Sequence, residues 1–84
     1  MPTATLTLEI QPRKAEAILK KLREWKEELG EENFSFSYEM GITKIHVGIK
    51  TDSLAELDLQ KATVEALEGV EKTETHLHIN FYSL

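Results

Sequence analysis

The spacing of apolar residues constrains this chain more than any other feature, because it switches repeatedly between the two-residue period of a strand and the 3.6-residue period of a helix. Thr3 to Ile10 alternate between apolar and polar side chains, which predicts a half-buried strand. Apolar residues then follow at helical spacing between Pro12 and Gly30: Ala15, Ile18, Leu19, Leu22, Trp25 and Leu29. Proline is favoured in the first turn of a helix and glycine just after the last. This part of the chain therefore predicts a strand followed by a helix, with Trp25 in the core.

Two more alternating segments follow, and they predict a β-hairpin. Asn33 to Glu39 and Ile42 to Lys50 each alternate between inward and outward side chains. A two-residue loop at Met40-Gly41 would pair Tyr38 with Thr43, Phe36 with Ile45, and Phe34 with Val47. Because side chains of a strand alternate between faces, turn length and hydrophobic parity both favour this register.

The second half of the chain predicts a helix and a closing strand. Ser53 with Glu56 three residues later is a capping-box pattern, so we expect a helix from there to about Glu68, with Gly69 ending it. Thr73 to Tyr82 then alternates as a strand. Its inward side chains would be Thr75, Leu77, Ile79 and Phe81, and its outward ones Glu74, His76, His78, Asn80 and Tyr82.

The apolar residues of this second helix form two groups rather than one stripe. One group is Ala55, Leu59, Ala62, Ala66 and Val70. Leu57 and Val64 project about 140 to 160 degrees away from it, at about 100 degrees per residue. Two interpretations stay open: a broad buried arc in which Leu67 joins the groups, or a small exposed strip of Leu57 and Val64 that contacts a partner. We favour the buried arc, because scattered apolar residues on a surface are ordinary.

The order strand, helix, hairpin, helix, strand predicts an α+β fold of ferredoxin-like type. Two right-handed crossovers around a central hairpin give an antiparallel sheet with the strand order 4-1-3-2 and both helices on one face. A variant with swapped edge strands is the alternative topology. Since the chain has 84 residues and no linker or low-complexity segment, residues 1–84 are expected to form a single βαββαβ two-layer domain.

Composition excludes several classes of function. The chain contains no cysteine, which excludes disulfides, thiolate zinc sites and cysteine nucleophiles. Its net charge of −5 argues against nucleic-acid binding, which needs Lys and Arg gathered on one face. No apolar stretch approaches the roughly 20 residues of a membrane span, and the first residues lack a signal-peptide pattern. We therefore expect a soluble, cytoplasmic protein that binds no membrane.

The outward face of the predicted sheet is short of aromatic residues. RNA-recognition modules of similar fold stack bases on aromatic rings of the two central strands. The corresponding positions here are Thr3, Thr5, Thr7, Lys44 and His46. Only Tyr82, on an edge strand, could stack a base, so we expect no RNA binding.

Three possible metal ligands lie close together on the last predicted strand. Glu74, His76 and His78 lie at alternate positions, about 7 Å apart along one face, and imidazole and carboxylate are good ligands for zinc, nickel and copper. His46 lies two strands away, about 10 Å across the first strand, which is too far to complete a tight site. We therefore predict no metal site and keep Glu74, His76 and His78 as the only candidate ligands.

No pattern indicates catalysis. Arg13 follows the first strand, where acylphosphatases of this fold carry a phosphate-binding loop, but Gln11-Pro12-Arg13-Lys14 lacks the glycines of that loop. The chain also lacks a Gly-rich P-loop, a Ser-His-Asp set and paired inward carboxylates. The alternating charges of the first helix, Glu28 among them, are interpreted as its solvated face. We therefore expect no enzyme activity, no catalytic residue and no cofactor.

The segment from Gly69 to Thr75 resembles the end of the ligand-binding domains of leucine-responsive (Lrp/AsnC-type) regulators. That resemblance implies amino-acid binding between subunits and a Gly-Asp pair near the central hairpin, whereas here Gly41 is followed by Ile42. The Gly69-Val70 pair is also similar to NapD-type chaperones, which bind Tat signal peptides.

The local signals together resemble de novo designed or computationally redesigned ferredoxin-like proteins. A proline at a helix start, a capping box, glycines at helix ends and a two-residue hairpin all agree with one fold, although Gly48 inside a strand departs from that pattern. We therefore predict that the protein is a designed or redesigned stable scaffold without catalytic or ligand-binding function. We expect it to be a monomer that needs no partner, with a homodimer as the second option. The alternative is a small natural regulatory or chaperone-like module that recognises an amino acid or peptide through a dimer interface or sheet edge.

Overall fold

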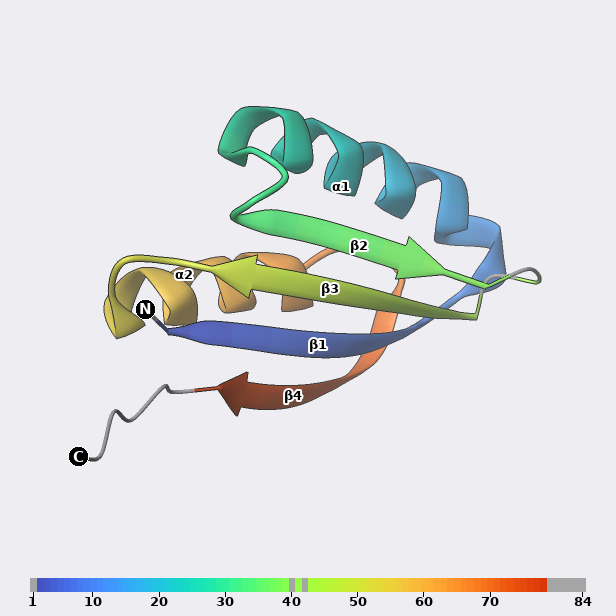
Figure 1. Ribbon diagram of the computed structural model, residues 1–84. Coiled ribbons are helices and arrows are strands. Elements are labelled where there is room, and N and C mark those ends of the chain that lie inside the picture. Colours follow the sequence, from blue (N-terminus) through green and yellow to red (C-terminus); the bar gives the residue numbers. More distant parts are fainter. Residues whose placement is uncertain (1, 40, 42, 79–84) are drawn as a thin grey trace.

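The computed structural model describes residues 2–39, 41 and 43–78. Within these residues the chain forms β1 (Thr3–Ile10), the short 3-10 helix η1 (Pro12–Lys14), α1 (Ala15–Leu29), β2 (Phe34–Tyr38), β3 (Lys44–Lys50), α2 (Leu54–Glu65) and β4 (Val70–His78) (Figure 1). The part of the predicted last strand beyond His78, Tyr82 included, lies outside the described residues. Among the described residues, no helix combines the length and the hydrophobicity needed to cross a membrane.

The strands form one antiparallel sheet in the order β2-β3-β1-β4 (Figure 1), which confirms the predicted ferredoxin-like fold. α1 connects β1 to β2, and α2 connects β3 to β4, so that both helices cover the same face of the sheet. α1 packs against β2, while α2 packs against β1, β3 and β4. α1 therefore lies mainly over the β2 edge of the sheet, and α2 lies over the strands β1, β3 and β4.

The β2–β3 hairpin has a different register from the predicted one. The observed pairs are Phe34 with Ile49, Phe36 with Val47, and Tyr38 with Ile45. Each partner lies two residues beyond the predicted one, so the same side chains stay on the same face of the sheet, although Tyr38 is 43% exposed there. Alternation therefore cannot distinguish the two registers. The predicted two-residue loop is wrong, because the strands end at Tyr38 and begin again at Lys44. Thr43, expected to face inward, is exposed in this longer connection.

The core lies between the sheet and the helices. Its largest fully buried side chains are Phe34, Leu6, Leu8, Ile18, Leu22, Ile45, Leu57, Val47 and Val64. Trp25 packs against the edge of this core and is only partly buried. The prediction that Trp25 lies in the core therefore holds only in part, because its ring packs against the core and also reaches the surface.

The side of α2 that faces the core is the opposite of the predicted one. Leu57 and Val64 are 0% and 1% exposed, so an exposed strip formed by these two residues is wrong. Leu59 is 70% exposed, and the alanines of its group are exposed as well: Ala55, Ala62 and Ala66. The broad buried arc is therefore also wrong. An alanine buries little apolar area, so the two larger residues, seven positions apart, decide which side of the helix packs inward.

α2 begins at the predicted cap and ends sooner than predicted. The Ser53 hydroxyl accepts a hydrogen bond from the Glu56 N–H at 3.2 Å, which satisfies one of the free donors of the first turn. After the helix ends at Glu65, Gly69 adopts a φ of +99°. A Cβ at this position would lie 2.5 Å from the Lys14 Cβ. Glycine is thus needed here both for the backbone angle and for the close approach of the turn after α2 to Lys14 of η1.

Candidate functional site

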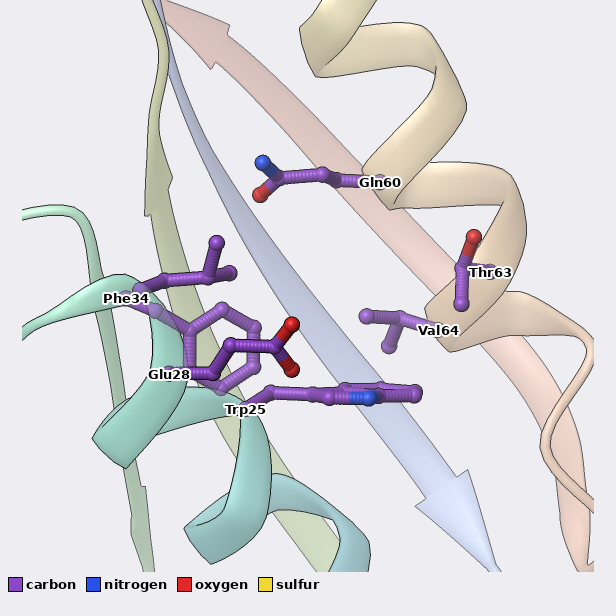
Figure 2. A pocket seen from close by; sticks show the side chains of 7 residues that line it. Trp25, Glu28, Phe34, Gln60, Thr63 and Val64 are labelled. Carbon is purple, nitrogen blue, oxygen red and sulfur yellow. The ribbon is translucent and has the colours of Figure 1, made fainter.

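A cleft of about 150 Å³ opens between the last turns of α1 and the second half of α2 (Figure 2). It is lined by Trp25, Glu28 and Leu29 from α1, Phe34 from β2, and Gln60, Thr63 and Val64 from α2. Figure 2 shows the Trp25 ring reaching from α1 toward Val64, with the Glu28 side chain above the ring and the Gln60 side chain extending from α2 into the same space. The cleft is therefore built by the end of α1, the start of β2 that follows it, and α2, which lies far from both in the sequence.

Aromatic and aliphatic groups form the walls of the cleft. The ring centroids of Trp25 and Phe34 are 6.1 Å apart and their planes meet at 86°, the edge-to-face geometry that aromatic pairs favour. Phe34 and Val64 are each 1% exposed, so they are held by the core. Because two of its walls are anchored in this way, the cleft is formed by the fold itself and does not need a ligand to shape it.

Gln60, Thr63 and Glu28 bring polar groups into the cleft. The Gln60 Oε1 atom is buried and accepts no hydrogen bond from any described residue, and such an unpaired acceptor costs about 1 to 3 kcal/mol. The Thr63 hydroxyl donates to the Leu59 carbonyl at 2.9 Å, so its proton is already engaged. Glu28 is exposed and carries the only charge among the lining residues. The cleft therefore contains acceptors that a ligand with N–H or O–H donors would satisfy.

Two of the three predicted candidate metal ligands, Glu74 and His76, lie on the opposite face of the sheet from the helices. In the β1–β4 register, Glu74 is opposite Thr7 and His76 is opposite Thr5, and both Glu74 and His76 are exposed. His78 ends β4, and its side chain lies outside the described part of the structure. Among the described side chains, no group of three His, Cys, Asp or Glu residues is placed to hold a metal ion.

The other residues that the sequence suggested for chemistry lie apart from one another. His46 Nδ1 is 3.3 Å from the Thr7 hydroxyl oxygen, so β1 separates His46 from Glu74, as the predicted topology requires. Arg13 is exposed, and its Nε donates to the Gln11 Oε1 at 3.3 Å. Neither residue reaches the cleft between the helices.

No sequence pattern singled out Glu28, Gln60 or Thr63 as site residues. Gln60 lies between Leu57 and Val64 on the helix, which makes it a polar residue on the buried side of α2. That signal was present in the sequence, but it could be recognised only with the correct side of α2 facing inward. Glu28 gave no comparable signal, because a carboxylate on an exposed helix face is ordinary.

No family model matches the sequence, and no curated protein matches it. Solved structures do match. TTHA0845 from Thermus thermophilus has a TM-score of 0.71 at 22% identity, with 100% of each chain covered. The hypothetical protein PHS023 from Pyrococcus horikoshii has a TM-score of 0.73 at 19% identity, covering 98% of this chain and 94% of that one. An antibiotic biosynthesis monooxygenase has a TM-score of 0.65 at 14% identity, with coverage of 96% and 99%.

The expectation of a designed or redesigned protein is wrong. Natural proteins share this fold over the whole or nearly the whole chain, and consistent caps, turns and patterning also mark evolved sequences, whose local signals support one another. Gly48 has a packing reason, since a Cβ there would lie 2.9 Å from the Ser35 Oγ on the paired strand. The resemblances to Lrp/AsnC-type regulators and NapD-type chaperones are not supported by these structures. At identities of 22% and below, the likeness shows that this chain has a ferredoxin-like fold that natural proteins use.

Proposed function

We propose that this protein is a small-molecule-binding module whose ligand lies in the cleft between α1 and α2. The observation that carries the proposal is the Gln60 Oε1 atom, a buried acceptor without a donor, in a cleft walled by Trp25, Phe34 and Val64. Sites for small molecules are concave and mostly apolar, with a few polar groups that orient the ligand. This cleft has that composition, and it differs from the dimer interface or sheet edge that the sequence suggested.

The volume of the cleft sets the size of the group that enters it. About 150 Å³ is below the roughly 300 to 1,000 Å³ of sites for drug-sized ligands. It is close to the volume of an apolar cavity of about 150 Å³ that binds benzene. We therefore expect a single ring or a short branched chain inside the cleft, with any remaining part of the ligand in solvent.

Binding without catalysis fits the lining best. One solved structure of the same fold is an antibiotic biosynthesis monooxygenase, so this fold is compatible with small-molecule chemistry. Among the described residues that line the cleft, however, Glu28 is the only titratable side chain. Acid–base and nucleophilic catalysis generally need a nucleophile with a base, or an acid and a base together. We therefore propose a carrier or sensor rather than an enzyme.

A fragment screen by ¹H–¹⁵N NMR tests this proposal. Ring-sized fragments should first shift the signals of the Trp25 indole N–H and the Gln60 side-chain amide. Thr63→Phe should place a ring in the cleft and abolish these shifts. Ala62→Phe, at the adjacent exposed position that does not line the cleft, is the matched control and should retain them. The proposal is wrong if no fragment shifts the two signals, or if both variants bind fragments equally well.

A further inference from the structure

We infer that the cleft selects organic cations, such as a primary amine attached to a single ring. This inference rests on the proposed function, since it names the chemical class of the ligand for the same cleft. It follows from three observations: the charge at the rim, the acceptor in the interior and the aromatic walls.

The charge at the rim is negative and is not neutralised by the protein. Two lysines next to lining residues in the sequence are paired with other carboxylates: Lys26 Nζ, two positions before Glu28, lies 3.6 Å from Glu31 Oε1, and Lys61 Nζ, directly after Gln60, lies 3.9 Å from Glu65 Oε1. Glu28 forms no ion pair with any described residue. Its carboxylate is therefore free to pair with a positively charged ligand.

The surroundings of Glu28 strengthen this preference for a cation. Glu28 lies in the last turn of α1, where the helix dipole places partial negative charge. No lysine, arginine or histidine is among the described residues that line the cleft, and the whole chain carries a net charge of −5. A ligand carboxylate would therefore be repelled at this rim, and an ammonium group would be attracted.

The interior offers a second oxygen and two aromatic rings to the same ligand. Figure 2 shows the Glu28 carboxylate and the Gln60 amide entering the space above the Trp25 ring from opposite helices. An ammonium group there would donate to Glu28 and to the buried Gln60 Oε1, which satisfies the unpaired acceptor. The partly buried Trp25 ring adds cation–π attraction, and Trp25 and Phe34 together form an apolar wall for the ring of the ligand.

Three probes of similar size separate charge from shape: benzylamine, benzyl alcohol and benzoate. Binding can be followed by the fluorescence of Trp25, the single tryptophan of the chain, and by the NMR signals of the cleft. At pH 7, where the amine is protonated, the Kd of benzylamine should be about three- to tenfold lower than that of benzyl alcohol, with benzoate the weakest. The advantage of the amine should shrink as salt is added.

Substitutions then assign the preference to particular residues. Glu28→Gln should raise the Kd of benzylamine about three- to fivefold and change that of benzyl alcohol much less, because the glutamine keeps an acceptor oxygen but loses the charge. Glu27→Gln is the matched control, because Glu27 is exposed on the same turn but does not line the cleft; it should change neither Kd appreciably. Gln60→Glu adds a second carboxylate and should tighten benzylamine binding. An unchanged ¹H–¹⁵N spectrum away from the cleft verifies that each variant folds.

The outcomes distinguish this inference from the proposed function. If the three probes bind in the cleft with equal Kd, or if Glu27→Gln weakens the amine as much as Glu28→Gln does, the preference for cations is wrong and the binding function stands. The same holds if neutral fragments shift the cleft signals and benzylamine does not. If fragments of every charge fail to bind, the proposed function fails together with the inference.

Discussion

Replacing Leu57 by alanine should remove much of the stability of this protein, and replacing Leu59 should remove almost none. Leu57 is 0% exposed and Leu59 is 70% exposed, although they lie two positions apart on α2. The comparison tests which side of α2 faces the core. It also tests the cleft, because the same orientation of the helix brings Gln60 and Val64 into it.

The expected loss in the free energy of unfolding follows from the burial of the two side chains. Leu57→Ala removes three carbon atoms from a fully buried site, worth about 2.4 kcal/mol at about 0.8 kcal/mol each, and the cavity left behind raises the loss to about 3 to 5 kcal/mol. The free energy of unfolding of a chain this long is about 4 to 13 kcal/mol, at about 0.05 to 0.15 kcal/mol per residue. Leu59→Ala, at an exposed position, should stay within about 0.5 kcal/mol.

Urea unfolding, followed by Trp25 fluorescence and circular dichroism, measures both losses. With an m-value of about 1 to 3 kcal/mol/M, the midpoint of Leu57→Ala should fall by about 1 M or more, and that of Leu59→Ala should hardly move. Leu57→Val, with an expected loss of about 1 kcal/mol, preserves the comparison if the alanine variant does not fold. A loss in Leu59→Ala equal to or larger than that in the Leu57 variants would mean that α2 faces the core with its other side, and the cleft would then not exist.

Three further predictions concern the ends of α2. Gly69→Ala should lose about 2 kcal/mol or more, because a side chain at φ +99° is strained and its Cβ would lie 2.5 Å from the Lys14 Cβ; thermal unfolding checks this, and a stabilised variant would contradict it. Ser53→Ala should lose about 1 kcal/mol, because the Glu56 N–H loses its cap; an unchanged urea midpoint would refute the role of that hydroxyl. Lys14, which donates to Glu68 at 3.0 Å, holds the pKa of the Glu68 carboxyl below its ordinary value of 4.5. The pair should therefore add a small stability that is present above pH 4.5 and lost as the pH falls through the lowered pKa; an NMR titration in which Lys14→Gln leaves the Glu68 pKa unchanged would contradict this.

The fold could be predicted because apolar periodicity determines which face of each strand is buried. The alternation of Thr3 to Ile10 was enough to place β1 in a half-buried sheet, and the cap at Ser53 located the start of α2, whereas the helix ends at Glu65, before the end predicted from Gly69. The register of the hairpin could not be predicted from this information. Since a shift of two residues buries the same side chains, only the length of the loop after Tyr38 distinguishes the registers, and the sequence carried a misleading turn signal at Gly41.

The candidate site was harder to predict than the fold, because it depends on the orientation of a helix with two apolar sides. The sequence prediction gave alanines the same weight as leucines and therefore placed Leu59 on the inward side of the helix. With that orientation, Gln60 was not recognised as a polar residue on the buried side. The free energy gained by burial increases with the apolar area that is buried. The side of α2 that carries Leu57 and Val64 therefore packs against the core, and the side that carries the alanines is exposed. A polar residue between two large apolar residues of one helix side is the signal that would have identified Gln60.

Intermolecular nuclear Overhauser effects between benzylamine and the protein test most directly whether a small molecule binds between α1 and α2. We predict contacts from the ring protons of the ligand to the methyl groups of Val64 and Thr63 and to the indole protons of Trp25. Contacts to the opposite face of the sheet, for example to Thr7 or His46, without any to Val64, would contradict the assignment of this cleft as the binding site.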